Sequence, residues 1–288
     1  MLQQTTPTDI PPRDSATVVM LRDTVDGLEV FLMQRSGQSD TFGETYVFPG
    51  GKLDPCDCSP DALAALDGEM GELAQTLGEP QREPALAAGL YVAALRELFE
   101  EAGVLLSHGN TRPASNAPGD WRAWLQTAAG QLQARALRPW SRWITPRVAA
   151  MSKKRFDTRF FLALAPTDQD ARHDDFETTA SIWLTPREAL RRWDCGEITM
   201  APPQIMSLAH LARYTHSVQV LQAACTQAPP CICPENFRDE NGQIILCYPG
   251  DPRHSVPQRA LPGPTRLYLR NQRFEVEGGV DALCGDSD

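Results

Sequence analysis

The feature that most constrains this chain is a short acidic segment, ALRELFEEAGV at residues 94–104. In an α-helix Glu97, Glu100 and Glu101 stand at i, i+3 and i+4, so three carboxylates share one face. The opposite face carries apolar side chains at i, i+3, i+4 and i+7 and can bury against a sheet; these are Leu95, Leu98, Phe99 and Ala102. Acidic helix faces are often merely solvated, but a bound cation is the sharper reason to gather three carboxylates.

The surroundings of the three glutamates favour the cation. Arg96 lies one turn before Glu100 and can hold its carboxylate, and Gly103 predicts a left-handed helix end. Upstream, a short apolar strand at 46–48 runs into Pro49, Gly50 and Gly51. A Gly-Gly backbone can approach a phosphate closely or offer a carbonyl oxygen to a metal ion.

Together the two segments resemble the Nudix box of the Nudix hydrolase superfamily. That motif reads Gly, five residues, Glu, seven residues, then Arg-Glu-U-x-Glu-Glu-x-Gly-U, where U is aliphatic. The second half matches at every fixed position from Arg96 to Val104. The first half is interrupted, because Gly51 precedes Arg96 by 45 positions instead of the motif's 14. Counted back from Arg96, the isolated glutamate of the motif falls on Ala88, so that acid is expected to be absent.

The interrupted box is similar to that of the peroxisomal coenzyme A diphosphatase subgroup and its bacterial relatives. This resemblance implies an α/β fold, the Nudix α/β/α sandwich with a mixed central sheet. It also implies hydrolysis of a small-molecule phosphoanhydride, most readily coenzyme A or acyl-coenzyme A, giving acyl-phosphopantetheine and 3′,5′-ADP. NADH, ADP-ribose or a nucleotide sugar is the alternative, because Asp40 and Glu44 depart from the subgroup's loop signature, which Arg35 and Ser36 fit loosely. A Nudix-fold sensor without turnover is the alternative of another class, and the intact acidic run argues against it.

The resemblance also assigns roles to residues. Mg²⁺ or Mn²⁺ is expected on Glu97, Glu100 and Glu101. Arg96 is expected to orient the acids without touching substrate, while Glu100 or Glu177 would assist deprotonation of the attacking water. Substrate contacts are expected from Arg35, Gly50, Gly51, Lys154 and Arg155. Lys154 and Arg155 lie in the most basic stretch of the chain, which is either a solvated loop or a phosphate-binding element.

Charge and composition narrow the partners. With 37 acidic and 27 basic residues the net charge is −10, which argues against nucleic acid as a partner. The polar start of the chain predicts neither a secretory signal nor a membrane span, and therefore a cytoplasmic location. Cys225, Cys231, Cys233 and Cys247 lack the paired spacing of ordinary zinc sites, so zinc is the weaker interpretation of that cluster.

The chain divides into three expected parts, and the second of them carries an insertion. Residues 1–14 are expected to be a disordered lead, and 15–224 the hydrolase domain. An insertion at 55–83 is expected to form one helix from Ser59 to Gly78, as a lid or wall beside the site or as a neutral excursion. Residues 225–288 form a small β-rich appendage that packs on the domain or pairs two chains into a homodimer. Within the domain we expect a hairpin of strands 15–23 and 28–35, helices at 119–137 and 202–224, and a strand at 155–165.

Overall fold

The computed structural model describes residues 10–35, 44–109, 112–113, 115, 118–147, 154–172 and 178–285. Nine strands form one mixed sheet in the order β8-β3-β2-β1-β6-β5-β9, with β4 paired to β1 and β7 paired to β2. Their bounds are β1 Arg13–Thr24, β2 Gly27–Arg35, β3 Thr45–Val47, β4 Gly50–Lys52, β5 Arg138–Ile144, β6 Phe156–Leu164, β7 Thr178–Leu184, β8 Thr199–Met200 and β9 Cys231–Ile232. Strands β1 and β6 are parallel, whereas β1 and β2 form the expected hairpin.

The central strand β1 separates two cores, because successive side chains of a strand point to opposite faces. Val18 and Met20 belong to one buried cluster, and Val19 and Leu21 belong to the other. Both faces of the sheet are therefore covered by helices.

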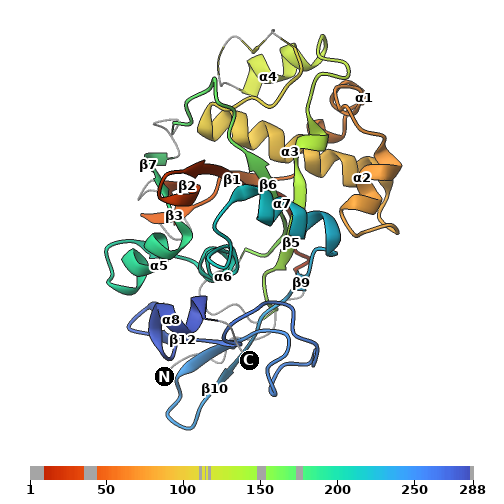
Figure 1. Ribbon diagram of the computed structural model, residues 1–288. Helices are drawn as coiled ribbons and strands as arrows, with labels where there is room; N and C mark the ends of the chain where they lie inside the picture. Colours follow the sequence, from red (N-terminus) through yellow and green to blue (C-terminus); the bar gives the residue numbers. More distant parts are fainter. Residues whose placement is uncertain are drawn as a thin grey trace.

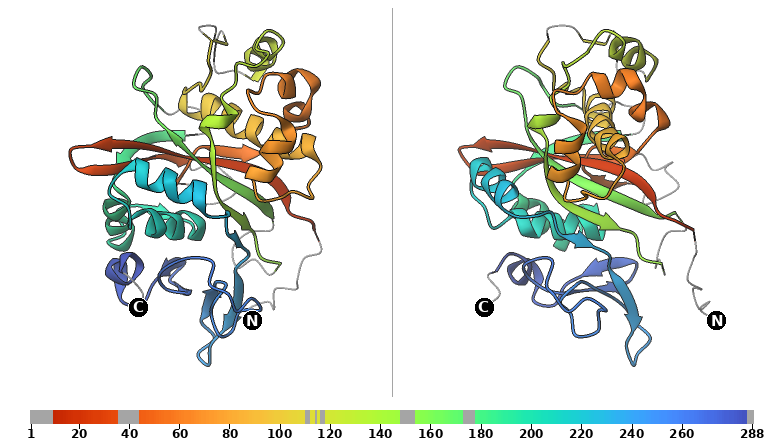
Figure 2. Two further views of the ribbon diagram at one scale, coloured as in Figure 1. Left: turned by 45° about the vertical axis from the view of Figure 1, so that its right-hand side comes forward. Right: turned by 90° about the vertical axis from the view of Figure 1, so that its right-hand side faces the viewer.

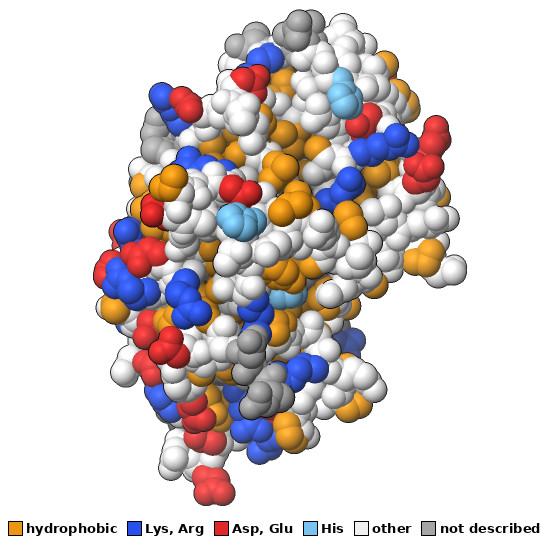
Figure 3. Space-filling model, viewed as in Figure 1, with side chains coloured by type: hydrophobic (Ala, Val, Ile, Leu, Met, Phe, Trp, Pro, Cys, Tyr) orange, Lys and Arg blue, Asp and Glu red, His pale blue; other side chains and the backbone are white. Residues whose placement is uncertain are grey.

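The first face carries the long helix α3, Pro84–Ala102, with α1 Pro60–Ala64, α2 Met70–Thr76 and α4 Pro118–Leu125 (Figure 1). The second face carries α5 Pro186–Asp194, α6 Pro202–Leu211 and α7 Ser217–Thr226 (Figure 2). Two 3₁₀ turns, η1 Pro55–Cys58 and η2 Ala134–Ala136, complete the first layer. On the molecular face drawn in Figure 3, acidic and basic side chains are interspersed.

The insertion is not the single helix that the sequence predicted. Ser59 caps α1 and Pro60 opens it, as expected, but α1 ends at Ala64. The backbone then bonds to a distant segment, since Leu132 N donates to Ala65 O at 2.7 Å and Asp67 N donates to Leu132 O at 2.9 Å. The same bonds end the expected helix 119–137 after Leu125, because residues 130–132 are committed to this pairing.

Ion pairs fasten the end of the insertion to the sheet. Glu79 accepts two bonds from Arg159 of β6, at 2.8 and 2.7 Å, and Arg82 pairs with Asp14 of β1. Strand β1 thus begins at Arg13, inside the expected lead, and residues 1–9 of that lead lie outside the described residues.

The expected helix 202–224 is two helices, α6 and α7. Asp23 at the end of β1 accepts bonds from the backbone and hydroxyl of Ser217, at 2.8 and 2.7 Å. These bonds fix the start of α7 and break the helical course between residues 212 and 216.

The C-terminal part is built around a second sheet of four antiparallel strands. Its elements are β10 Glu235–Arg238, β11 Ile244–Cys247, β12 Arg266–Arg270, β13 Arg273–Glu275 and helix α8 Gly279–Cys284. The strand expected at 267–276 is a hairpin, because Asn271 and Gln272 both adopt positive φ, at 49° and 63°. Leu267 and Phe274 pack in the same buried cluster as α6, and β9 extends the main sheet beside β5. None of the described helices is long and apolar enough to cross a membrane.

Candidate active site

Helix α3 presents the acids as the sequence predicted. Glu83 caps the helix, Pro84 begins it, and Gly103 ends it with φ 68°. Leu95, Leu98 and Phe99 are buried against the sheet. Glu97 and Glu100 are partly exposed, whereas Glu101 is only 9% exposed.

The Gly-Gly turn contacts this acidic face directly. The Gly50 backbone N–H donates to Oε2 of Glu101 at 2.8 Å. Gly51 lies so close to Glu97 that a Cβ at this position would overlap its carboxylate. Strand β4 is fixed there because Gly50 and Gly51 pair with Thr17 and Ala16 of β1. The structure thus brings together the two segments that lie 45 residues apart in the sequence.

Arg96 organises the acids and has no donor left for a substrate. Its Nη1 donates to Glu97 at 2.8 Å and to Glu100 at 2.9 Å. Its Nε and Nη2 donate to the two oxygens of Asp57 at 2.8 and 2.9 Å, and Nη2 also reaches the Lys52 carbonyl at 3.2 Å. All five N–H groups of a guanidinium are then used.

Asp57 is the site residue that the sequence reasoning missed. It is fully buried, and besides Arg96 it accepts a bond from the Asp54 backbone N–H at 2.8 Å. Five residues separate Gly51 from Asp57, the same number that separates the glycine from the isolated glutamate in the motif, so Asp57 holds the position of that glutamate. The acid is therefore present as an aspartate, and the extra residues follow it. Ala88, where the backward count placed this acid, is a buried residue of α3.

The electrostatics follow from burial and from Arg96. Burial raises the pKa of Glu97 to about 6, while the guanidinium of Arg96 acts in the opposite direction. For Arg96, burial opposes the charged form, but the bonds that it donates to Asp57 and the charges of Glu97, Asp57 and Glu100 outweigh burial and raise the pKa of Arg96. The guanidinium stays charged and offsets part of the negative charge of the cluster.

The donor set suits a hard divalent cation. Carboxylate and carbonyl oxygens are the ligands of Mg²⁺ and Mn²⁺, and here three carboxylates adjoin the Gly-Gly backbone. Across the described ranges, no three His, Cys, Asp or Glu side chains already converge on one point. At the acidic face this is because Arg96 bridges Glu97 and Glu100, while Glu101 turns to Gly50. Cys225, Cys231, Cys233 and Cys247 are all described and do not converge either, so the structure does not support the weaker, zinc interpretation of that cluster.

Other predicted site residues lie elsewhere. Arg155 is 8% exposed and donates to the carbonyls of Thr145 at 3.1 Å and Ile10 at 2.7 Å. Its backbone carbonyl accepts a bond from the Arg13 N–H, so Arg155 lies at the start of β1. Thr17, which pairs with Gly50, is four residues further along this strand, a separation of roughly 13 Å at the rise of a strand. Its position therefore does not support the predicted phosphate contact. Lys154 is exposed beside it, and Arg35 ends β2. Glu177 and Asp40 lie outside the described residues.

Comparison with known proteins gives consistent relatives. The family described as the NUDT19 Nudix domain matches residues 12–211. The acyl-coenzyme A diphosphatase NUDT19 of Gallus gallus is 30% identical over 233 residues, 65% of this chain and 62% of that protein. The NUDT19 protein of Homo sapiens is 28% identical over 245 residues, 70% of this chain and 65% of that protein. Each match thus spans less than two thirds of the diphosphatase.

A solved structure shares the architecture. The crystal structure of a NUDIX hydrolase from Alicyclobacillus acidocaldarius superposes with a TM-score of 0.60 at 25% sequence identity. The superposition covers 77% of this chain and 99% of that one.

Proposed function

This chain belongs to the Nudix hydrolase family, in the group of the NUDT19 Nudix domain, and from that premise we propose that it hydrolyses the diphosphate bond of a nucleoside diphosphate derivative. The observation that carries the proposal is the acidic face of α3. Arg96 and Asp57 hold its carboxylates beside the Gly-Gly turn, where a diphosphate can approach the backbone.

Glu97, Glu100 and Glu101 would hold Mg²⁺ or Mn²⁺. Bound there, the ion would neutralise charge on the diphosphate and lower the pKa of a water molecule. This binding requires the Arg96 guanidinium to share Glu97 and Glu100 with the ion. Because Asp57 retains the other side of the guanidinium, Arg96 can give up part of its contact with the glutamates without losing its partner.

The chain's own groups then manage the proton and the position of the substrate. Water oxygen adds to one phosphorus atom, the bridging P–O bond breaks, and the leaving phosphate departs with the bridging oxygen. Glu100 is our candidate to accept the proton of the attacking water, with Glu177 as the alternative. Glycine at positions 50 and 51 lets the turn lie close to β1 and to the Glu97 carboxylate, where a side chain would collide.

Coenzyme A or acyl-coenzyme A is the substrate we favour. The matched relatives of Gallus gallus and Homo sapiens are named acyl-coenzyme A diphosphatases. The interrupted box of this chain also resembles the box of the coenzyme A diphosphatase subgroup. The products would be 3′,5′-ADP and phosphopantetheine or its acylated form. The loop signature of the subgroup is incomplete at Asp40 and Glu44, so NADH and ADP-ribose belong in the same assay.

The test is hydrolysis with mass detection of products over coenzyme A, acetyl-coenzyme A, NADH and ADP-ribose, with Mg²⁺ or Mn²⁺. We expect 3′,5′-ADP to dominate. AMP from NADH or ADP-ribose as the main product would refute the coenzyme A assignment while retaining diphosphate hydrolysis. Glu100→Gln should lose about a hundredfold or more in kcat, whereas the exposed control Glu240→Gln should retain full activity. No turnover of any of these substrates would favour a non-catalytic sensor.

A further inference from the structure

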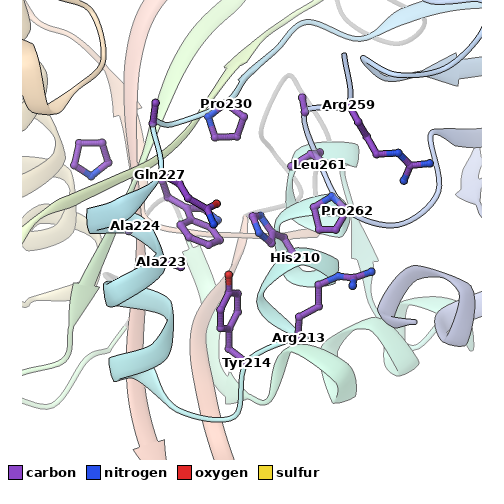
Figure 4. A pocket seen from close by; sticks show the side chains of 14 residues that line it. His210, Arg213, Tyr214, Ala223, Ala224, Gln227, Pro230, Arg259, Leu261 and Pro262 are labelled. Carbon is purple, nitrogen blue, oxygen red and sulfur yellow. The ribbon is translucent and has the colours of Figure 1, made fainter. Parts of the chain in front are cut away.

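A second cavity lies on the other side of the sheet from the acids. It encloses about 560 Å³ between β5, the ends of α6 and α7, and the loop at 259–262 of the C-terminal part (Figure 4). Trp140 on its wall belongs to the buried cluster of α5 and α6, whereas the acidic helix α3 packs in the opposite cluster. The cavity is therefore separate from the candidate active site. Its volume is typical of pockets for small organic ligands.

The inner wall combines aromatic rings with polar groups. The rings of Trp140 and His210 stack with centroids 4.4 Å apart, and Tyr214 packs against both at 6.2 Å. Nδ1 of His210 is buried and has no hydrogen-bond partner among the described residues. In Figure 4 the hydroxyl of Tyr214 and the amide of Gln227 point toward the same space as the His210 ring.

The rim of the cavity is cationic. Arg213 and Arg259 line it, and none of the described residues that line it is acidic, although the chain carries a net charge of −10. Both guanidinium groups lie on the same side of the cavity in Figure 4. Arg259 Nη1 donates to the Gly263 carbonyl at 2.6 Å, and Arg213 Nη2 donates to the Gly285 carbonyl. Arg259 keeps further N–H groups for an anion, for which a planar guanidinium fork is well suited.

Taken together, these walls select one chemical class. A hydrocarbon chain would leave the hydroxyl of Tyr214 and the amide of Gln227 unpaired, and inorganic phosphate would make no use of the aromatic rings in the wall. A planar heterocycle that carries a phosphate group satisfies both parts, by stacking on the rings and pairing with the guanidinium groups. We propose that this cavity is a second binding site that takes a mononucleotide, with the base among Trp140, His210 and Tyr214 and the phosphate toward Arg213 and Arg259.

The test measures AMP binding to the full chain by calorimetry, with a chelator present so that the acidic face holds no metal. Saturable binding is expected, together with a shift of the His210 ring resonances in NMR. Arg259→Gln should weaken AMP at least about tenfold, whereas Arg270→Gln, the same change on an exposed arginine of β12, should leave it unchanged. Gln227→Glu places a negative charge in an exposed wall position and should also abolish binding, whereas Gln222→Glu on α7 should not.

Two comparisons make the proposal refutable. Adenosine and inorganic phosphate should each bind at least about tenfold more weakly than AMP, since each satisfies only one part of the cavity. Phosphate binding as tightly as AMP would overturn the mononucleotide assignment. The proposal also fails if AMP does not bind at millimolar concentration, or if its binding survives both cavity substitutions but is lost in Glu100→Gln.

Discussion

Replacing Asp57 by asparagine tests whether this buried carboxylate holds the active-site arginine. Asp57 is fully buried, and its two oxygens accept two bonds from Arg96 and one from the Asp54 backbone. Asparagine keeps the shape but offers only one oxygen, and its NH₂ group must face another donor. The guanidinium also loses its full counter-charge in the interior. From the cost of breaking a buried ion pair we expect a loss of about 2–4 kcal/mol in the free energy of unfolding.

The substitution should also weaken metal binding. Without the Asp57 charge, Arg96 is held mainly by Glu97 and Glu100, so it competes more strongly with a divalent cation for them. The Mg²⁺ concentration for half-maximal hydrolysis should rise roughly tenfold, as for other groups that orient metal ligands. Urea unfolding gives the first quantity and an Mg²⁺ titration of the rate gives the second. The matched control is Asp61→Asn, an exposed aspartate in α1. If Asp57→Asn equalled this control in both measurements, the positioning role of Asp57 would be refuted.

Three further predictions address the turn, the insertion and the second cavity. Gly51→Ala should reduce hydrolysis sharply with little change in stability, because the added Cβ meets the Glu97 side chain. Gly50→Ala should instead lower the urea concentration at which the chain unfolds, because its Cβ meets the backbone of β1. Glu79→Gln should cost about 1–3 kcal/mol of unfolding free energy without altering the Mg²⁺ titration, because the buried Arg159 loses one carboxylate partner but keeps Asp14 and Asp157. Burial lowers the pKa of His210 to about 4 in the folded protein. As the pH falls, the imidazole of the unfolded chain is therefore protonated before that of the folded chain, and the free energy of unfolding should decrease between about pH 6.5 and 4. That loss amounts to about 3 kcal/mol and should be absent from the pH profile of His210→Phe; equal profiles would contradict it.

Much of the fold follows from local sequence patterns. The spacing of apolar and acidic residues predicted α3, its buried face and its end at Gly103. Two β-rich runs separated by Asp26 and Gly27 predicted the β1–β2 hairpin. The α/β/α sandwich with a mixed sheet is the Nudix fold, as the resemblance implied, and the solved hydrolase from Alicyclobacillus acidocaldarius shares it. These features depend on contacts within one element or on a motif with fixed spacing.

The errors concern segments whose course depends on distant partners. The helices expected at 59–78, 119–137 and 202–224 are shorter because backbone and side-chain bonds to residues far away in the chain interrupt them. The phosphate contact expected for Arg155 stays a prediction, and in the structure its Nε and Nη1 donate to the carbonyls of Thr145 and Ile10. Asp57 could have been found by counting forward from Gly51 as well as backward from Arg96.

The position of β9 has a consequence for how the chain unfolds. Strand β5 would be the open edge of the main sheet, and β9 covers it through the pairs Arg142 with Cys231 and Trp143 with Ile232. The C-terminal sheet also shares a buried cluster with α5 and α6, so residues of the 225–285 segment contribute to the same hydrophobic core. A chain truncated after residue 224 would expose the apolar side chains under the C-terminal sheet and the edge of β5. Exposed apolar patches and unpaired strand edges both promote aggregation. Intact, the two sheets should melt together in one calorimetric transition, and two separate transitions would show that the shared layer does not couple them.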